Sequence, residues 1–178
     1  LASADVPIKG LDVLIDALAK LKGRGRTPRL TVIGSLRDGP TKRALKDTGL
    51  IDSVDFVSGL SLDEIVALYR RATVFVSASR FEGFGFPAAE AMACGAPVIV
   101  SRGGALPEVA GDAGLVTEVE DADGLADALE RVLSDPALRQ QMSAACAARA
   151  HSAFRWDEHA RASLDLYAQA LEERGRLP

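Results

Sequence analysis

The fold is decided by residues 73–92, which read Thr73-Val-Phe-Val-Ser77, then Ala78-Ser-Arg-Phe-Glu82-Gly-Phe-Gly85, then Phe86-Pro-Ala-Ala-Glu90-Ala-Met92. The first five residues are mostly β-branched or aromatic and predict a buried strand. Gly83 and Gly85 let the backbone approach a ligand closely, and Pro87 suits the first turn of a helix. The amides of Phe86, Ala88 and their neighbours would then point into a cleft, where free amides at a helix start favour an anion such as phosphate.

Similar strands recur on both sides of this stretch, and each is followed by an amphipathic segment. Strands that alternate with helices of about ten to fifteen residues imply parallel pairing through crossover helices. The sequence therefore predicts a Rossmann-like α/β fold, a doubly wound parallel sheet flanked by helices, with its ligand outside the carboxyl ends of the strands. The other expected strands are residues 29–33, 54–57, 97–100 and 115–117, with the tail of a further strand at 1–4.

The helices are predicted from apolar spacing and from capping residues. Ser61 and Glu64 form a capping-box pattern, and Ser134-Asp-Pro136 places a capping residue before a proline at another helix start. A final helix is expected from about Trp156. Trp156 and Tyr167 are interpreted as packing residues of that helix. Apolar stripes are expected at Leu11, Leu14, Ile15, Leu18 and Leu21, and in the last helix at Ala160, Leu164, Tyr167 and Leu171.

Composition restricts the class of protein. The 178 residues fit one domain, 1–178, and are 48% hydrophobic and 26% charged, as in a globular domain. A net charge of −4 without a basic cluster argues against nucleic acid as a partner, and Pro87, Gly95 and Pro97 break the longest stretch of low charge, which argues against a transmembrane segment. Two cysteines fit a reducing, cytoplasmic setting and no metal site. Because the chain does not begin with methionine, we expect it to be part of a longer protein.

Glu82 and Glu90 flank the glycine-rich turn. An isolated pair of acids at this spacing is usually solvated, but here both follow a buried strand and surround an expected phosphate site. Carboxylates do not bind phosphate themselves. Because an ionised carboxylate accepts two hydrogen bonds, paired hydroxyls such as those of a ribose and a hexose are the natural partners of these two acids.

Glu82 and Glu90, with seven residues between them, resemble the E-x7-E motif of the retaining glycosyltransferases of family GT4, which have the GT-B fold. The similarity extends from Arg80 through Val100, and Lys9-Gly10 is similar to the family's lysine–glycine element. Downstream, Gly103-Gly104-Ala-Leu-Pro-Glu108 and Phe154-Arg-Trp156 fit the same pattern. The resemblance covers nearly the whole chain and implies the C-terminal, nucleotide-sugar-binding domain of a GT-B fold.

The resemblance implies roles for individual residues of the chain. Glu90 would hold the ribose hydroxyls of the donor, Glu82 would contact hydroxyls of the transferred sugar, and Lys9 would neutralise charge on the leaving diphosphate. Glu82 and Lys9 are thus the expected catalytic residues. Donor binding is expected at Glu90, Lys9 and the backbone of Gly83, Phe84, Gly85 and Phe86.

The resemblance also implies the reaction partners. The donor would be a UDP- or GDP-linked sugar, used without a metal or cofactor. The chain's own N-terminal domain, absent here, would bind an acceptor that stays open among lipid, polysaccharide and small molecule. Without that domain the chain is expected to be inactive, and peripheral membrane association through it stays open.

The sequence departs from the family pattern just before Lys9. Family members commonly carry an arginine shortly before the lysine, whereas residues 1–8 contain none, so Ser3 or a basic residue from elsewhere would have to replace it.

Three alternative functions stay open. Gly83-x-Gly85-x-x-Ala88 followed by Arg102 matches an NADP-dependent oxidoreductase pattern, although the four residues 79–82 separate it from its strand. The other two alternatives are a non-catalytic nucleotide-binding or regulatory module and a sugar-nucleotide epimerase.

Overall fold

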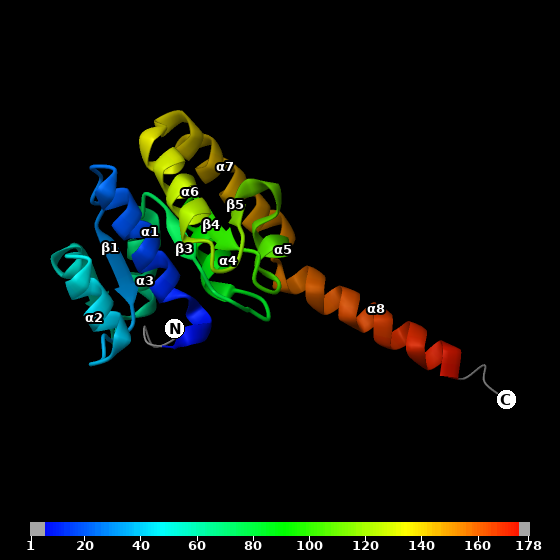
Figure 1. Ribbon diagram of the computed structural model, residues 1–178. Coiled ribbons are helices and arrows are strands. Elements are labelled where there is room, and N and C mark those ends of the chain that lie inside the picture. Colours follow the sequence, from blue (N-terminus) through cyan, green and yellow to red (C-terminus); the bar gives the residue numbers. More distant parts are fainter. Residues whose placement is uncertain (1–5, 175–178) are drawn as a thin grey trace.

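The computed structural model describes residues 6–174 and confirms the alternation of strands and helices (Figure 1). Every strand expected between residues 29 and 117 is present within two residues of its predicted bounds. The strand tail expected at 1–4 lies outside the described residues. The elements are η1 (Pro7–Lys9), α1 (Leu11–Gly23), β1 (Leu30–Ile33), α2 (Pro40–Asp47), η2 (Ile51–Ser53), β2 (Val54–Val57), α3 (Leu62–Arg71), β3 (Phe75–Ser77), α4 (Phe86–Ala93), β4 (Val98–Ser101), α5 (Leu106–Ala110), η3 (Gly111–Ala113), β5 (Leu115–Thr117), α6 (Ala122–Ser134), α7 (Pro136–Ala153) and α8 (Trp156–Arg174).

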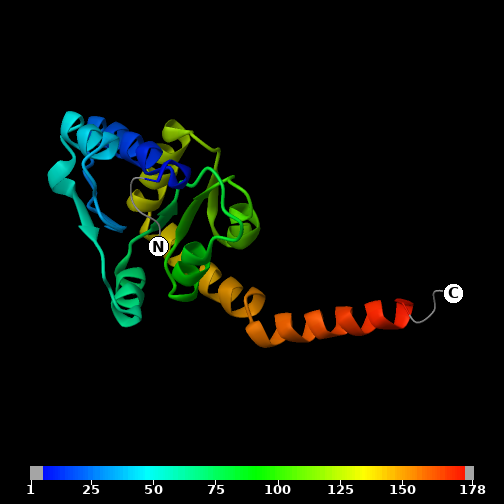
Figure 2. The same cartoon turned by 90° about the horizontal axis from the view of Figure 1, so that it is seen from below.

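All of the strand pairs are parallel, as crossover helices require. β1 pairs with β2, with Leu30 opposite Val54, and a second hydrogen-bonded group has the order β3-β4-β5, with Val76 opposite Ile99. Helices cover both faces of these strands (Figure 2). The architecture is therefore the predicted Rossmann-like α/β fold. Its strands form two hydrogen-bonded groups, one of two strands and one of three.

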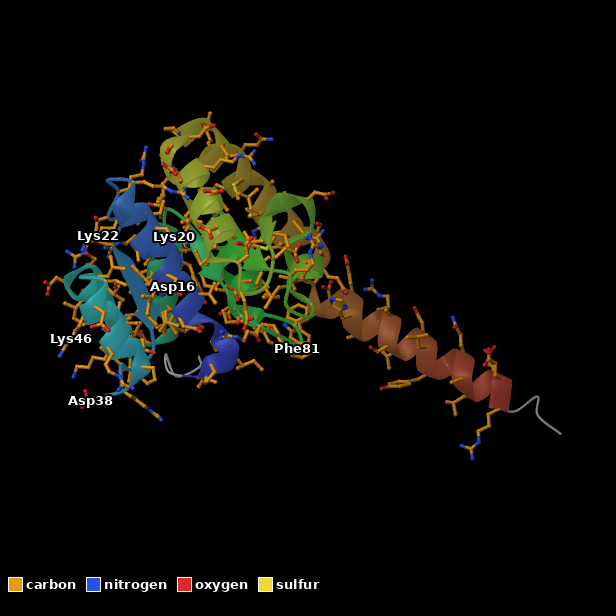
Figure 3. All side chains as sticks on the ribbon, in the orientation of Figure 1. Asp16, Lys20, Lys22, Asp38, Lys46 and Phe81 are labelled. Carbon is orange, nitrogen blue, oxygen red and sulfur yellow. The ribbon has the colours of Figure 1, made fainter. Side chains whose placement is uncertain are left out.

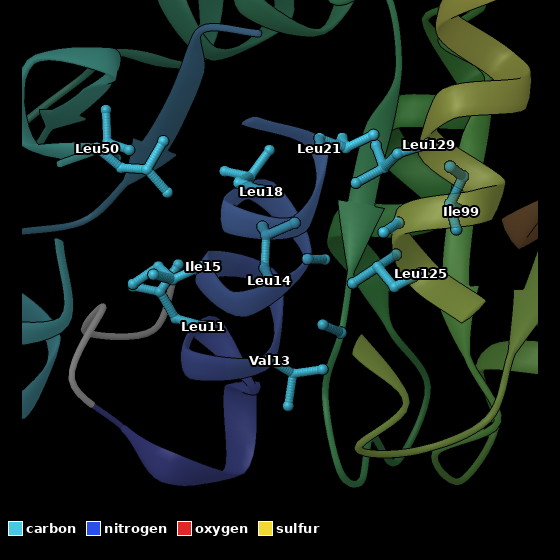
Figure 4. Packing of buried hydrophobic residues seen from close by; sticks show 14 of the residues in the cluster. Leu11, Val13, Leu14, Ile15, Leu18, Leu21, Leu50, Ile99, Leu125 and Leu129 are labelled. Atoms are coloured by element: carbon cyan, nitrogen blue, oxygen red, sulfur yellow. The ribbon is translucent and has the colours of Figure 1, made fainter. Parts of the chain in front are cut away.

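The central strand β4 divides the core into two layers. Successive side chains of a strand point to opposite faces, and here Ile99 packs with α1 and α6 while Val98 and Val100 pack with α4, α5 and α7. All four residues of β4 are buried. Figure 4 shows α1 with Leu50 on one side and with Ile99 and leucines of α6 on the other. One apolar cluster thus joins the β1–β2 part of the chain to the β3–β4–β5 part.

The predicted helix starts are confirmed. Ser61 accepts from the Glu64 amide while the Glu64 carboxylate accepts from the Ser61 amide, which is a complete capping box. At the start of α7 the capping side chain is Asp135, which accepts from the amides of Ala137 and Leu138, and Pro136 follows it. These caps satisfy amides that a helix start leaves without partners.

The last helix is present, but the packing role expected for its aromatic residues is wrong. Trp156 is 77% exposed and Tyr167 is 67% exposed. Figures 1 and 2 both show α8 extending away from the rest of the molecule, so its apolar residues have no described element to pack against. In the part of the chain that the structure describes, no helix combines the length and apolar character needed to cross a bilayer.

Candidate functional site

Lys9 and Glu82, which are far apart in sequence, form an ion pair at the carboxyl end of β3. Lys9 Nζ lies 2.7 Å from Glu82 Oε1, and the two side chains are 33% and 16% exposed. Glu82 belongs to the loop formed by residues 78–85, which we call the β3–α4 loop, and Lys9 ends η1. Gly10 makes this approach possible, because its φ is +64° and a Cβ there would lie 2.0 Å from the carbonyl oxygen of Ala78.

Glu82 is held through one of its two carboxylate oxygens. Ser79 Oγ donates to Oε1 at 2.9 Å, the same oxygen that Lys9 contacts. Ser79 is nearly fully buried, and Ser77 Oγ in turn donates to Ser79 Oγ at 3.4 Å. Within residues 6–174 the other oxygen, Oε2, receives no hydrogen bond. The carboxylate is therefore anchored on one side and open to a hydroxyl donor on the other.

The loop after β4 contacts and supports the β3–α4 loop. Ser101 Oγ donates to the carbonyl of Ser79, and the Ala105 amide donates to the carbonyl of Glu82 at 3.0 Å. A Cβ on Gly103 would lie 2.3 Å from the Ser79 oxygen, and one on Gly104 would lie 2.3 Å from the Glu82 oxygen. Glycine is required at both positions because the two loops meet backbone to backbone.

The start of α4 presents backbone amides, with one correction to the prediction. The Ala88 amide donates to the Gly85 carbonyl at 2.9 Å, so it is not free to meet an anion. The amides of Phe84, Gly85 and Phe86 have no backbone acceptor among the described residues. Gly85, with φ of +97°, caps the helix, and Phe84 and Phe86 lie on the surface with ring centroids 4.8 Å apart. These three amides are the group suited to an anion.

Glu90 lies in α4 and is oriented by a different neighbour. Tyr69 of α3 donates from its hydroxyl to Glu90 Oε2 at 3.2 Å. Burial raises the pKa of Tyr69, and the negative charge of Glu90 raises it further, so the hydroxyl keeps its proton. Between residues 6 and 174 no hydrogen bond or ion pair joins Glu90 to Lys9 or Glu82. The structure therefore joins two of the three predicted residues directly and places the third on the adjacent helix.

Several residues of the site were missed by sequence reasoning. Ser79 donates to Glu82, Tyr69 donates to Glu90, and Ser101 donates to the carbonyl of Ser79. Arg80 contacts the residues before Lys9. The serines carried a usable signal, since they are polar residues at the carboxyl ends of β3 and β4, where this fold places ligands. Arg80 and Tyr69 gave no such signal because their partners lie far away in sequence.

A charged hollow elsewhere on the surface does not belong to this site. It is lined by Asp38 and Gly39, which precede α2, and by Lys42, Arg43 and Lys46 of α2. Figure 3 shows Asp38 and Lys46 well separated from Phe81, the neighbour of Glu82. Over residues 6–174, no group of three or more His, Cys, Asp or Glu side chains is arranged to hold a metal ion.

Comparison with known proteins identifies relatives in sequence and in fold. The MMP alpha-(1->4)-mannosyltransferase of Mycolicibacterium hassiacum is 39% identical over 176 residues, covering 96% of this chain and 42% of that protein. The sucrose-phosphate synthase of Thermosynechococcus elongatus has a TM-score of 0.81 at 29% identity, over 94% of this chain and 44% of that one. The chain thus spans less than half the length of either protein.

A solved structure of similar size also matches. The C-terminal domain of a glycosyl transferase group 1 family protein from Francisella tularensis has a TM-score of 0.73 at 30% identity, over 85% of this chain and 82% of that one. The sequence profile of the family described as "Glycosyl transferases group 1" matches residues 2–149. This chain belongs to the glycosyl transferases group 1 family.

Proposed function

We propose that this chain is the donor-binding domain of a retaining glycosyltransferase, which moves a sugar from a nucleoside diphosphate sugar to an acceptor. The observation that carries the proposal is the 2.7 Å ion pair between Lys9 and Glu82, beside the amides of Phe84, Gly85 and Phe86. A cation and helix-start amides suit a diphosphate, and a carboxylate suits sugar hydroxyls. Membership of the family supports the same class of reaction.

Lys9 has the capacity to serve both parts of the donor. A lysine ammonium carries three N–H donors, and the contact with Glu82 uses one of them. The other two are available to phosphate oxygens, so Lys9 would bridge the diphosphate and the Glu82 carboxylate. That bridge keeps Glu82 Oε2 directed to the sugar while the positive charge lies against the leaving group.

The proposed reaction breaks the bond between the anomeric carbon and a diphosphate oxygen, and the electron pair leaves with the nucleoside diphosphate. The acceptor hydroxyl forms a new bond to that carbon from the same face, which retains the configuration, and its proton passes to the leaving phosphate. Lys9 is half-buried and stabilises the charge that builds up on the leaving group, so the scheme needs neither a metal nor a cofactor. Acceptor binding is assigned to an N-terminal domain, and we propose that this chain alone does not complete the transfer.

Glu90 is proposed to hold the ribose of the donor. Tyr69 occupies one of its carboxylate oxygens and fixes its orientation, which leaves hydrogen-bonding capacity for a pair of hydroxyls. UDP and GDP are the nucleotides proposed, and the acceptor class is left open.

The binding part of the proposal is tested by calorimetric titration of this chain with UDP, GDP, ADP and NADP. We expect one nucleoside diphosphate to bind, and we expect Glu90→Ala to weaken it about tenfold or more, since hydrogen bonds to a charged group contribute roughly 1.5–3 kcal/mol. Asp16→Asn, at an exposed carboxylate on α1 (Figure 3), is the control and should bind as the wild type does. Binding of NADP alone, or unchanged affinity in Glu90→Ala, would contradict the proposal.

The chemical part requires the full-length protein and its sugar nucleotide. Glu82→Ala should lower turnover by about two to three orders of magnitude, in line with the loss of one electrostatic stabiliser, while affinity for the nucleoside diphosphate changes little. An unchanged turnover would remove Glu82 from the reaction. Donor binding with no transfer and no hydrolysis would favour the non-catalytic module instead.

A further inference from the structure

Arg80 joins three segments that meet beside the site. Its backbone amide donates to the carbonyl of Ile8 at 2.8 Å, and its guanidinium donates to the carbonyl of Pro7. The same guanidinium contacts both carboxylate oxygens of Asp12, at 3.0 and 2.8 Å, and donates from Nε to Glu120 at 2.8 Å. We call these contacts the Arg80 clasp.

The clasp acts on the segment that carries Lys9. Pro7 and Ile8 immediately precede Lys9, and Arg80 lies two residues before Glu82, so Arg80 closes the η1 turn onto the β3–α4 loop. Gly10 fixes the other end of the turn against Ala78. Lys9 is thus held from both sides, and the ammonium reaches Glu82 without any contact between Arg80 and the two charged groups themselves.

The partners of Arg80 are arranged for this contact. Asp12 lies in the first turn of α1, where a carboxylate is favoured by the helix dipole, and the hydrogen bond from Arg80 holds its pKa below the ordinary value. Glu120 has a φ of +62°, the one positive value at a non-glycine residue in the described part of the chain. Residues other than glycine rarely adopt that conformation, so Glu120 makes its contact with Arg80 from an uncommon backbone conformation.

We propose that Arg80 is a positioning residue, which fixes Lys9 so that its ammonium meets the diphosphate of the donor. This inference rests on the proposed function. A purely structural ion-pair cluster would lower the stability of the fold and would affect donor binding independently of Lys9. A positioning residue affects donor binding only through Lys9, and this difference can be measured.

The experiment is a double-mutant cycle on this chain, with UDP and GDP as probes and dissociation constants from calorimetry. The variants are Arg80→Gln, Lys9→Met and the double variant. We expect each single change to weaken the bound nucleotide about tenfold, within the range of coupling energies for residues of one network. The double variant should bind within about twofold of Lys9→Met. Losses that multiply to about a hundredfold would overturn the proposal.

Two further variants keep the test independent of folding. Arg24→Gln removes a similar arginine, which contacts Asp127 and Glu130 at the other end of α1, and it should bind nucleotide as the wild type does. Asp12→Asn weakens the clasp while Arg80 stays in place, and we expect a loss of about threefold that disappears in the Lys9→Met background. A wild-type chain that binds neither probe would overturn the proposed function together with this inference. A wild type that binds while the losses multiply would overturn this inference alone.

Discussion

Gly104→Ala is the sharpest test of how the Glu82 carboxylate is held in place. The added methyl group would lie 2.3 Å from the Glu82 carbonyl oxygen, whereas ordinary contact begins at 3.4 Å. The Glu82 backbone would therefore have to move by about 1 Å. Productive geometry tolerates displacements of only about 0.5 Å, and 1 Å is enough to cost roughly a hundredfold in rate.

The expected loss of stability follows from the same contact. Alanine at a φ of +65° costs about 1–2 kcal/mol. Displacing Glu82 strains the 3.0 Å hydrogen bond from the Ala105 amide, and forced overpacking costs roughly 1–3 kcal/mol. We expect a total of about 3 kcal/mol, which for a domain of 150–250 residues lowers the melting temperature by roughly 6–12 °C.

Gly25→Ala is the matched control for the backbone term. Gly25 also has a positive φ, +81°, but no atom lies within 4 Å of the position that its Cβ would occupy. Circular-dichroism melts of both variants isolate the contact with Glu82, and the turnover of both variants in the full-length protein measures its effect on the reaction. If Gly104→Ala melted at the same temperature as Gly25→Ala and turned over sugar nucleotide as fast, the loop after β4 would not support Glu82.

The remaining predictions concern three other contacts. Ser101→Ala removes a buried hydroxyl that donates to a carbonyl of the β3–α4 loop, and the unsatisfied acceptor should cost about 1–3 kcal/mol in urea unfolding. Tyr69→Phe keeps the ring but releases Glu90, so nucleotide affinity should fall by about threefold to tenfold in calorimetry, and an unchanged value would separate Glu90 from the ribose. The pKa of Asp12 is lowered by its hydrogen bond from Arg80, so its contribution to stability is present above pH 3.8 and is lost as the pH falls through the folded-state pKa. Acid unfolding of Asp12→Asn should therefore be less steep below pH 3.8 than that of the wild type, and equal slopes would contradict this.

The fold was predictable because its signals are local. The run Thr73-Val-Phe-Val-Ser77 is apolar enough to identify a strand, and the Ser61–Glu64 capping box identifies a helix start from four residues. The alternation of such signals allows few arrangements other than a parallel sheet with crossover helices. The division of the ladder into two groups was not predictable, because pairing between strands depends on distances that no local pattern encodes.

Candidate site residues could be proposed from the sequence only where the signal lies in their own stretch of chain. The turn from Glu82 to Phe86 and the acid at Glu90 fall into this class. The structure pairs Lys9 with Glu82, and the ligand roles assigned to Lys9, to residues 82–86 and to Glu90 stay predictions. The amide of Ala88 was assigned wrongly, because the Gly85 carbonyl turns back to accept from it. Trp156 and Tyr167 were misinterpreted because helical spacing shows that residues share a face and does not show what covers that face.

The support of the site comes mainly from backbone packing among three loops, and this has a consequence for interpreting mutations. Gly10 and Gly104 each bring one chain segment against the carbonyl of another, at positions where a Cβ would lie 2.0 and 2.3 Å away. Substitution of these glycines displaces Lys9 and Glu82 while both charges remain. Substitution of Lys9 or Glu82 removes a charge while the loops stay in place. If the proposed chemistry is correct, the first class of variant should lose affinity or turnover together with stability, and the second should lose affinity or turnover with little change in the melting temperature.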